Sequence, residues 1–144
     1  AMKFLPEEKT KHLLGIGTVE DIFNYVSLGL DTFDCVLATR LARQGSIFLR
    51  PESGGNEENK FRYRITNVKF KESLEPLDNN CECYVCKNFS QGYINHLFKA
   101  KEILSNTLAT YHNLYFFKKM MDEIRESIED GGFVELKKKW LERN

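Results

Sequence analysis

Three cysteines are concentrated in one short segment, at Cys81, Cys83 and Cys86. Their C-x-C-x-x-C spacing places three thiolates near one another in a loop, just before a helical pattern. Thiolates are good zinc ligands, and a closed structural zinc site takes four protein ligands in a tetrahedron. The segment therefore predicts three ligands of one zinc ion, and it requires a fourth from elsewhere in the chain.

The fourth ligand is expected to be one of the three histidines. We expect His112, because it lies on a long helical pattern whose antiparallel return can bring it back over the cysteine loop. His96 follows the cluster on a different helix face, and the more distant His12 is the remaining candidate. A C-x-x-C pair can also be a redox site, but that interpretation lacks a thioredoxin-like helix start and gives Cys81 no role. Four protein ligands leave no position for water, so this zinc would be structural and would contribute to folding.

The composition is that of a folded domain with balanced charge. Hydrophobic residues make up 42% of the 144 residues, and the 21 Lys and Arg residues equal the 21 Asp and Glu residues. A zero net charge removes the simplest argument for nucleic-acid binding, although a local basic patch stays open. No apolar run approaches the roughly 20 residues that cross a bilayer, and no signal peptide is recognisable. We expect no membrane contact and a cytoplasmic protein whose cysteines stay reduced.

The first third of the chain predicts a strand, a helix and a second strand. The apolar runs 12–17 and 32–37 are typical of short buried strands, and residues 18–29 have helical periodicity. Two strands joined by one helix at this spacing run parallel. Because two parallel strands are not a finished sheet, we expect the C-terminal part of a larger α/β protein.

The pattern changes after residue 45. Residues 45–49 predict a strand, and residues 61–70 predict one or two antiparallel strands. Polar loops are expected over 51–60 and 71–80. Helices are expected from Tyr93 to Leu104, from Leu108 to Ile128, and from Phe133 to Leu141.

Several segments together carry a family resemblance. They are His12–Gly17, Asp31–Gly45, Pro76–Cys86, Tyr93–Leu97 and Tyr111–Asn113. In this order and spacing, along nearly the whole chain, they resemble the tRNA-guanine transglycosylases, also called queuine tRNA-ribosyltransferases. The sequence departs from the family pattern at Ala38, where proline is usual, and at Gln91-Gly92, where Arg-Ala is common.

The resemblance implies a fold. The family has a (β/α)₈ TIM barrel with a zinc-binding subdomain inserted near its C-terminal end. Residues 1–45 would then be the last two barrel βα units with the nucleophile strand. Residues 46–144 would be the zinc-binding subdomain and the C-terminal helices that close the barrel.

The resemblance also implies a reaction and a nucleophile. The family exchanges a guanine at the anticodon wobble position of GUN-anticodon tRNAs for a 7-deazaguanine base, preQ1 or queuine. Asp34 would be the nucleophile, and a carboxylate can indeed hold a covalent glycosyl intermediate. From the residues alone, Asp34 is as readily a loop cap or a partner of Arg40.

Further roles follow from the same resemblance. Leu14 and Gly15 would line the base pocket, and Arg40 and Arg43 would hold the tRNA. Phe89, Tyr93 and His96 would form a homodimer interface, with an intrachain core as the alternative for these three.

The resemblance covers only a part of the family's catalytic apparatus. The general acid/base and most base-recognition residues lie outside this chain, so we expect the fragment alone to be inactive. The alternative function is a non-catalytic, zinc-stapled module that binds tRNA or a partner subunit. The end of the chain soon after Trp140 favours the bacterial or eukaryotic type.

Overall fold

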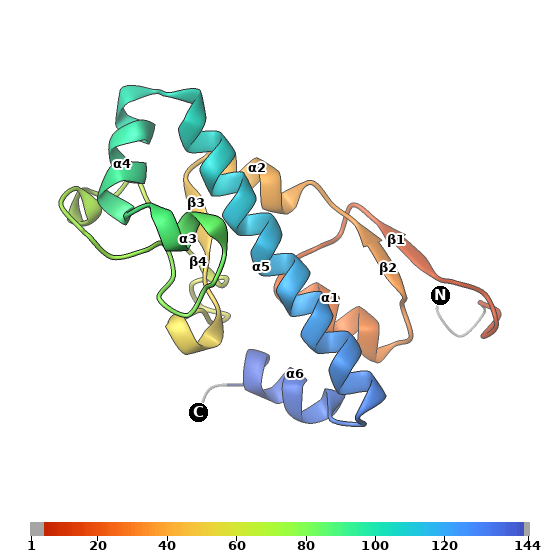
Figure 1. Ribbon diagram of the computed structural model, residues 1–144. Helices are drawn as coiled ribbons and strands as arrows, with labels where there is room; N and C mark the ends of the chain where they lie inside the picture. Colours follow the sequence, from red (N-terminus) through yellow and green to blue (C-terminus); the bar gives the residue numbers. More distant parts are fainter. Residues whose placement is uncertain (1–4, 143–144) are drawn as a thin grey trace. The chain divides into compact units, whose positions relative to one another are not determined.

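The computed structural model describes residues 5–142, which form two compact units divided between Leu37 and Ala38 (Figure 1). Each unit is described by itself. The predicted division after residue 45 refers to units of a barrel, and it stays a prediction.

The first unit is one parallel βαβ element. It contains β1 (His12–Leu14), α1 (Val19–Ser27) and β2 (Thr32–Asp34). The strands pair in parallel from His12 with Thr32 to Leu14 with Asp34, as the sequence predicted. Both strands are shorter than expected. The first ends where Gly15 takes a φ of 76°, a left-handed conformation that turns the chain out of the strand.

Thr18 begins α1 as predicted, because its hydroxyl accepts a hydrogen bond from the Asp21 backbone at 3.1 Å. The buried face of this helix consists of Val19, Ile22 and Phe23. These features make the first unit a mixed α/β element, and a complete barrel stays a prediction.

The second unit begins within α2 (Leu37–Arg43) and continues into an antiparallel pair, β3 (Ser46–Phe48) and β4 (Arg62–Arg64). The helix α2 was not predicted. Two 3₁₀ turns flank β4, at Pro51–Ser53 and Val68–Phe70, so residues 61–70 contain one strand rather than two.

Four helices complete the second unit: α3 (Tyr84–Asn88), α4 (Gln91–Ala100), α5 (Ile103–Glu129) and α6 (Phe133–Leu141). The break between α4 and α5 falls at Lys101, which has a left-handed φ of 60°. Ile103 and Leu104 therefore belong to α5 and not to the preceding helix. In Figure 1, α5 is the long element of this unit, and it contacts β3, α3, α4 and α6.

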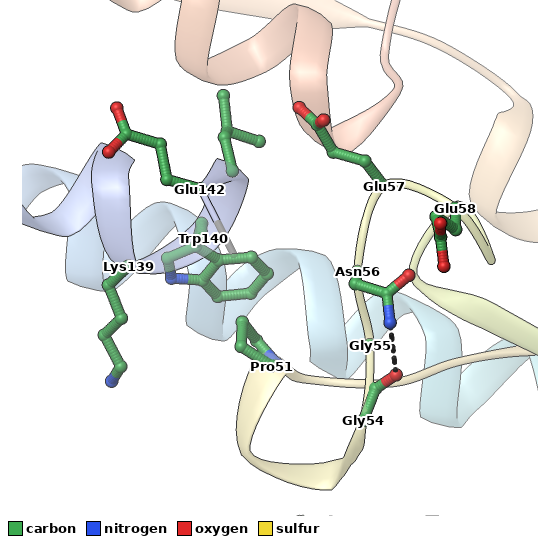
Figure 2. A pocket seen from close by; sticks show the side chains of 10 residues that line it. Pro51, Gly54, Gly55, Asn56, Glu57, Glu58, Lys139, Trp140 and Glu142 are labelled. Atoms are coloured by element: carbon green, nitrogen blue, oxygen red, sulfur yellow. Dashed lines mark hydrogen bonds between the residues drawn. The ribbon is translucent and has the colours of Figure 1, made fainter. Parts of the chain in front are cut away.

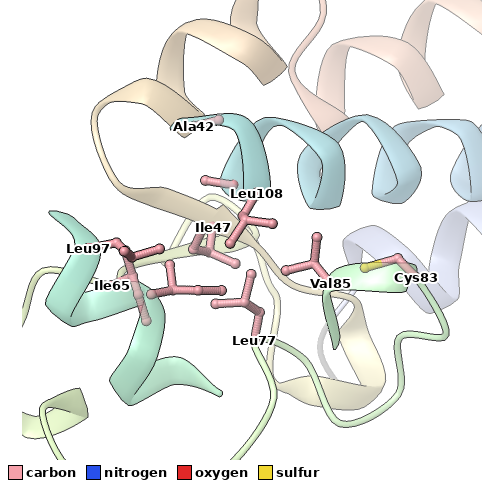
Figure 3. Packing of buried hydrophobic residues seen from close by; sticks show 10 residues of the cluster. Ala42, Ile47, Ile65, Leu77, Cys83, Val85, Leu97 and Leu108 are labelled. Atoms are coloured by element: carbon pink, nitrogen blue, oxygen red, sulfur yellow. The ribbon is translucent and has the colours of Figure 1, made fainter. Parts of the chain in front are cut away.

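One hydrophobic core joins these elements. Ile47 of β3 and Leu108 of α5 lie in it beside Val85 of α3 and Leu97 of α4 (Figure 3). Cys83 is part of the same cluster. The cysteine loop is therefore anchored in the core rather than suspended in solvent.

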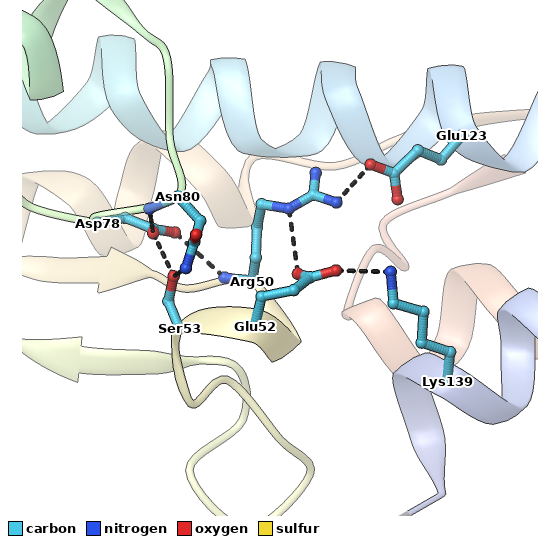
Figure 4. A network of polar contacts seen from close by, with 7 residues as sticks. All are labelled: Arg50, Glu52, Ser53, Asp78, Asn80, Glu123 and Lys139. Carbon is cyan, nitrogen blue, oxygen red and sulfur yellow. Dashed lines mark hydrogen bonds and ion pairs between the residues drawn. The ribbon is translucent and has the colours of Figure 1, made fainter.

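A polar network ties the end of β3 to the last two helices (Figure 4). The Arg50 guanidinium pairs with Glu123 of α5 and with Glu52 at 3.4 Å, and Glu52 pairs with Lys139 of α6 at 2.6 Å. The same guanidinium lies over the ring of Trp140, 5.7 Å from its centroid. These contacts hold Trp140 of α6 against the turn after β3 and α5.

No helix within residues 5–142 is both long enough and apolar enough to cross a lipid bilayer.

Candidate metal centre

The loop before the cysteines is organised by the buried carboxylate of Asp78. Its two oxygens accept hydrogen bonds from the backbone of Arg50 at 3.3 Å, from the backbone of Asn80 at 2.8 Å and from the Ser53 hydroxyl. The Cys81 backbone donates to the Asp78 carbonyl at 3.2 Å. Asp78 therefore sets the path of the chain into the cysteine cluster, and the sequence analysis did not single it out.

The structure brings Cys81, Cys83, Cys86 and His112 together. Their donor atoms all lie within 4.8 Å of one another. The Nδ1 atom of His112 lies 3.8, 3.6 and 3.3 Å from the sulfurs of Cys81, Cys83 and Cys86. In a zinc tetrahedron with Zn–S near 2.3 Å and Zn–N near 2.05 Å, the N–S edge is about 3.6 Å. The four donors therefore fit a tetrahedral metal ion.

His112 presents the correct nitrogen to the cysteines. It is fully buried on α5, and its Nε2–H donates to the Phe48 carbonyl at 2.9 Å. This bond places the ring proton on Nε2 and leaves the Nδ1 lone pair facing the sulfurs, which is the usual arrangement for a metal-binding histidine. Burial opposes protonation, but hydrogen bonds to Cys81 and Cys83 outweigh it and raise the pKa of His112 to about 10. The cysteine sulfurs therefore favour a positive charge at Nδ1, either a proton or, in its place, a metal ion.

The thiols share negative charge unequally. Cys83 is the N-cap of α3, and its sulfur accepts a hydrogen bond from the Cys86 backbone at 3.4 Å. Hydrogen bonds with Cys81 and Cys86 lower the pKa of the Cys83 thiol, whereas the same cluster raises the pKa of the Cys86 thiol. All four cysteines of the chain are free, so no disulfide competes for these sulfurs.

Asn113, the next residue of α5, completes the support of the site. Its Oδ1 accepts from the Phe48 backbone at 3.1 Å, and its Nδ2 donates to the carbonyls of Ala38 and Ser46 at 3.1 and 3.0 Å. The Leu49 N–H donates to the Phe61 carbonyl, so the backbone N–H and C=O groups of Leu49 face β4. Because these groups point to alternate sides along a strand, the backbone N–H and C=O groups of Ser46 and Phe48 point away from β4. His112 and Asn113 thus pair with the free edge of β3. The sequence signal for Asn113 is its place beside His112 in Tyr111–Asn113, one of the segments that carry the family resemblance.

The other two histidines have different surroundings. His96 is exposed on α4. His12 lies in the first unit, where its Nδ1 shares a hydrogen bond of 2.8 Å with the Thr32 hydroxyl.

A second set of predicted site residues meets in the first unit. Leu14 lies opposite Asp34 in the parallel register, and the Gly15 N–H donates to the Asp34 carbonyl at 2.7 Å. All three lie at the carboxyl ends of their strands, and all three are exposed. Within the described residues Asp34 has no ion pair, so its side chain is accessible to a ligand.

The remaining predicted residues lie in the second unit. Arg40 and Arg43 are exposed on α2, one helical turn apart. Phe89 and Tyr93 stack with ring centroids 5.6 Å apart, and Phe89 also contacts Tyr84 at 5.8 Å. Tyr93 is 42% exposed, so this aromatic row is only partly used by the core.

A separate hollow of about 570 Å³ lies between the 51–58 segment and α6 (Figure 2). Trp140 lies on one side of it. Its charged lining consists of Glu57, Glu58, Glu142 and Lys139, so carboxylates outnumber the single cation.

Comparisons with known proteins agree on one family. Residues 1–144 match the family described as queuine tRNA-ribosyltransferase. A putative queuine tRNA-ribosyltransferase of Archaeoglobus fulgidus is 53% identical over 95% of this chain and 34% of that protein. Queuine tRNA-ribosyltransferases of Aquifex aeolicus and Caldanaerobacter subterraneus are 46% and 44% identical over 98% and 97% of this chain, in each case 35% of the relative. The chain therefore spans about a third of the length of these curated relatives.

Proposed function

Because this chain belongs to the queuine tRNA-ribosyltransferase family, we propose that it is the C-terminal part of a tRNA-guanine transglycosylase. Residues 1–45, which include α2, would be the last two βα units of a (β/α)₈ barrel. Residues 46–144 would be the inserted zinc-binding subdomain and the C-terminal helices that close the barrel. The whole enzyme would exchange guanine for preQ1 or queuine at the wobble position of GUN-anticodon tRNAs.

One observation carries the proposal. Asp34 lies at the carboxyl end of β2, exposed, beside Leu14 and Gly15 at the same end of β1. Barrel enzymes carry their reacting groups at the carboxyl ends of their strands. An accessible carboxylate at this end can reach a bound nucleotide, whereas a structural cap would have its oxygens engaged.

Asp34 would act by double displacement. Its carboxylate oxygen attacks C1′ of the ribose, and the bond from C1′ to the guanine nitrogen breaks, with its electron pair leaving on guanine. An acid from outside this chain protonates the departing base. The incoming 7-deazaguanine then loses a proton and attacks C1′, and the Asp34 ester bond breaks. Two inversions retain the sugar configuration and leave the RNA backbone intact.

The neighbouring residues suit a flat base. Leu14 is 67% exposed and offers an apolar surface for one face of a purine. A side chain at Gly15 would meet no atom within 4 Å, so this position is open to a ligand. Arg40 and Arg43 lie on α2, where their guanidinium groups could pair with phosphates of the tRNA.

Zinc is the metal that the donor set fits. Cys81, Cys83, Cys86 and His112 would hold it with no open position, so the ion would be structural and take no part in the exchange. When bound, it would tie the cysteine loop to α5. Three reduced thiols suit a cytoplasmic protein, which is the location we propose.

A homodimer through the aromatic row of Phe89 and Tyr93, with His96 beside it on α4, is also part of the proposal. Aromatic side chains that stack on one another and stay partly exposed are typical anchors of protein interfaces.

The test supplies the other two thirds of the enzyme from a relative. Residues 5–142 would replace the corresponding third of the Aquifex aeolicus relative, and entry of labelled guanine into tRNA would be measured. We expect exchange with this hybrid and background with the 144-residue chain alone. Asp34→Asn in the hybrid should lower exchange roughly a thousandfold or more, and it should abolish the covalent protein–RNA adduct that we expect on a denaturing gel of the unchanged hybrid.

Asp31→Asn is the matched control. Asp31 is an exposed aspartate in the same unit whose Oδ2 accepts from the Lys11 backbone, a bond that an asparagine oxygen keeps. It should exchange as the unchanged hybrid does. Exchange by the Asp34→Asn hybrid at the unchanged rate would refute the assignment of the nucleophile.

A further inference from the structure

Three cations gather at one place on the second unit, although the chain as a whole has no net charge. Lys60, Arg62 and Arg64 line a hollow of about 420 Å³ between the end of α2 and β4. The lining also contains one carboxylate, Glu58, so positive charge predominates. A local excess of this kind is the footprint of an anionic ligand.

These cations are not used to hold the fold together. Within residues 5–142, none of Lys60, Arg62 and Arg64 lies within 4.0 Å of a carboxylate oxygen. Arg50 is different, because its guanidinium pairs with two glutamates. The three cations therefore keep their hydrogen-bond donors available for a partner.

The strand presents two of them in a fixed arrangement. Tyr63 lies between the two arginines, and its hydroxyl donates to the Leu77 carbonyl at 2.9 Å. Because side chains alternate across a strand, Arg62 and Arg64 share the face opposite Tyr63, about 6.7 Å apart along the chain. This spacing lets each guanidinium engage its own anionic group.

The turn before the strand fixes Lys60. Lys60 and Phe61 both have left-handed φ angles, 55° and 54°, which non-glycine residues seldom adopt. Phe61 is held there by burial and by contact with Trp140 at a centroid distance of 5.8 Å. Asn56 and Asn59 brace the turn reciprocally, because the backbone N–H of each donates to the side-chain Oδ1 of the other, at 3.0 and 3.1 Å. A strained, non-glycine backbone held this firmly often marks a site of recognition.

We propose that Lys60, Arg62 and Arg64 form a docking surface for the phosphodiester backbone of RNA. The inference rests on the proposed function for the identity of the polyanion. Charge distinguishes this hollow from the one beside Trp140, where three carboxylates face a single lysine and would repel phosphates.

The experiment measures binding without turnover. The 144-residue chain is titrated against a fluorescent tRNA transcript that has adenine at the wobble position, which cannot undergo guanine exchange, from 50 to about 400 mM KCl. Each phosphate contact contributes about 0.7 to 0.9 to the slope of log affinity against log salt. We expect Arg62→Gln with Arg64→Gln to reduce the slope by about 1.4 to 1.8 and to weaken binding about 25- to 60-fold at 0.1 M salt.

Three controls keep the result interpretable. The Arg62→Lys, Arg64→Lys chain keeps the charge and should keep most of the slope. Lys99→Gln with Lys101→Gln removes two exposed cations at the end of α4 and should leave the slope unchanged. Circular dichroism and zinc content show whether each variant is folded.

The outcomes separate this inference from the proposed function. Absence of RNA binding by the unchanged chain, or an unchanged slope in the Arg62→Gln, Arg64→Gln chain, would overturn the docking surface. Binding of labelled polyglutamate as tight as that of the transcript, through the same arginines, would overturn the choice of RNA. Arginine-dependent RNA binding together with an inactive hybrid would leave this surface standing and refute the exchange reaction instead.

Discussion

Asn113→Ala should be among the most destabilising substitutions that touch no metal donor. It removes the partners of the buried Phe48 N–H and Ser46 carbonyl, together with a second bond to the Ala38 carbonyl, which also accepts within α2. An unsatisfied buried polar group costs about 1–3 kcal/mol, so two such groups should cost at least about 2 kcal/mol of the free energy of unfolding. For a domain of this size, that loss corresponds to a fall in Tm of roughly 4–8 °C.

The same substitution should loosen the metal site. The Phe48 carbonyl orients His112, and the Phe48 N–H is held by Asn113, so losing the amide frees the backbone group that fixes the imidazole. Losing such support typically lowers metal affinity about 10- to 100-fold, which a competition titration with a chelator would measure.

The assay compares urea unfolding of the zinc-loaded chain with and without the substitution. Asn106→Ala is the control, since Asn106 is a half-buried asparagine on the same helix. It should change the free energy of unfolding by no more than about 0.5 kcal/mol. An Asn113→Ala chain that unfolds within 1 kcal/mol of the unchanged protein would refute the idea that α5 completes the edge of β3.

Three further outcomes follow from single residues. His112→Ala should abolish tight zinc binding in a metal assay and lower stability, and zinc retained at unchanged affinity would point to His96 instead. Gly15→Ala should cost about 1 kcal/mol, because the added Cβ meets no atom but φ stays at 76°, and thermal melts check this. Glu52→Gln should cost less than about 1 kcal/mol at neutral pH, since the side chain is partly exposed. Burial raises the pKa of Glu52, but the hydrogen bond from Lys139 and the nearby Arg50 outweigh it and bring the pKa below its ordinary 4.5. The contribution of Glu52 is therefore present above pH 4.5 and is lost as the pH falls through the folded-state pKa. Melts of both proteins should therefore differ at pH 7, and the difference should shrink as the pH is lowered through the folded-state pKa of Glu52.

The parts of the site that were predictable have local signatures. Three cysteines at metal-binding spacing are informative in themselves, and the helical register of residues 108–128 made His112 a reasonable fourth donor. The parallel pairing of β1 and β2 followed from a short crossover helix, since such connections admit little else.

The parts that were missed depend on partners distant in sequence. Asn113 has no meaning as a buried amide until β3 presents an edge to it, and Asp78 is an ordinary loop aspartate until Arg50 and Ser53 lie against it. The boundary between α4 and α5 was misplaced because Lys101 adopts a left-handed conformation, for which glycine is the usual signal.

The hydrogen bonds by which α5 covers the edge of β3 have a consequence for the synthesis of this protein. Phe48 leaves the ribosome 64 residues before the histidine that caps its carbonyl. At a synthesis rate of about 5–20 residues per second, one edge of β3 stays unpaired for roughly 3 to 13 s. An exposed edge of a strand whose side chains are normally buried can pair with strands of other chains. Nascent chains should therefore be most prone to aggregation in that interval. The interval ends when α5, which also supplies the fourth metal ligand, covers the edge of β3.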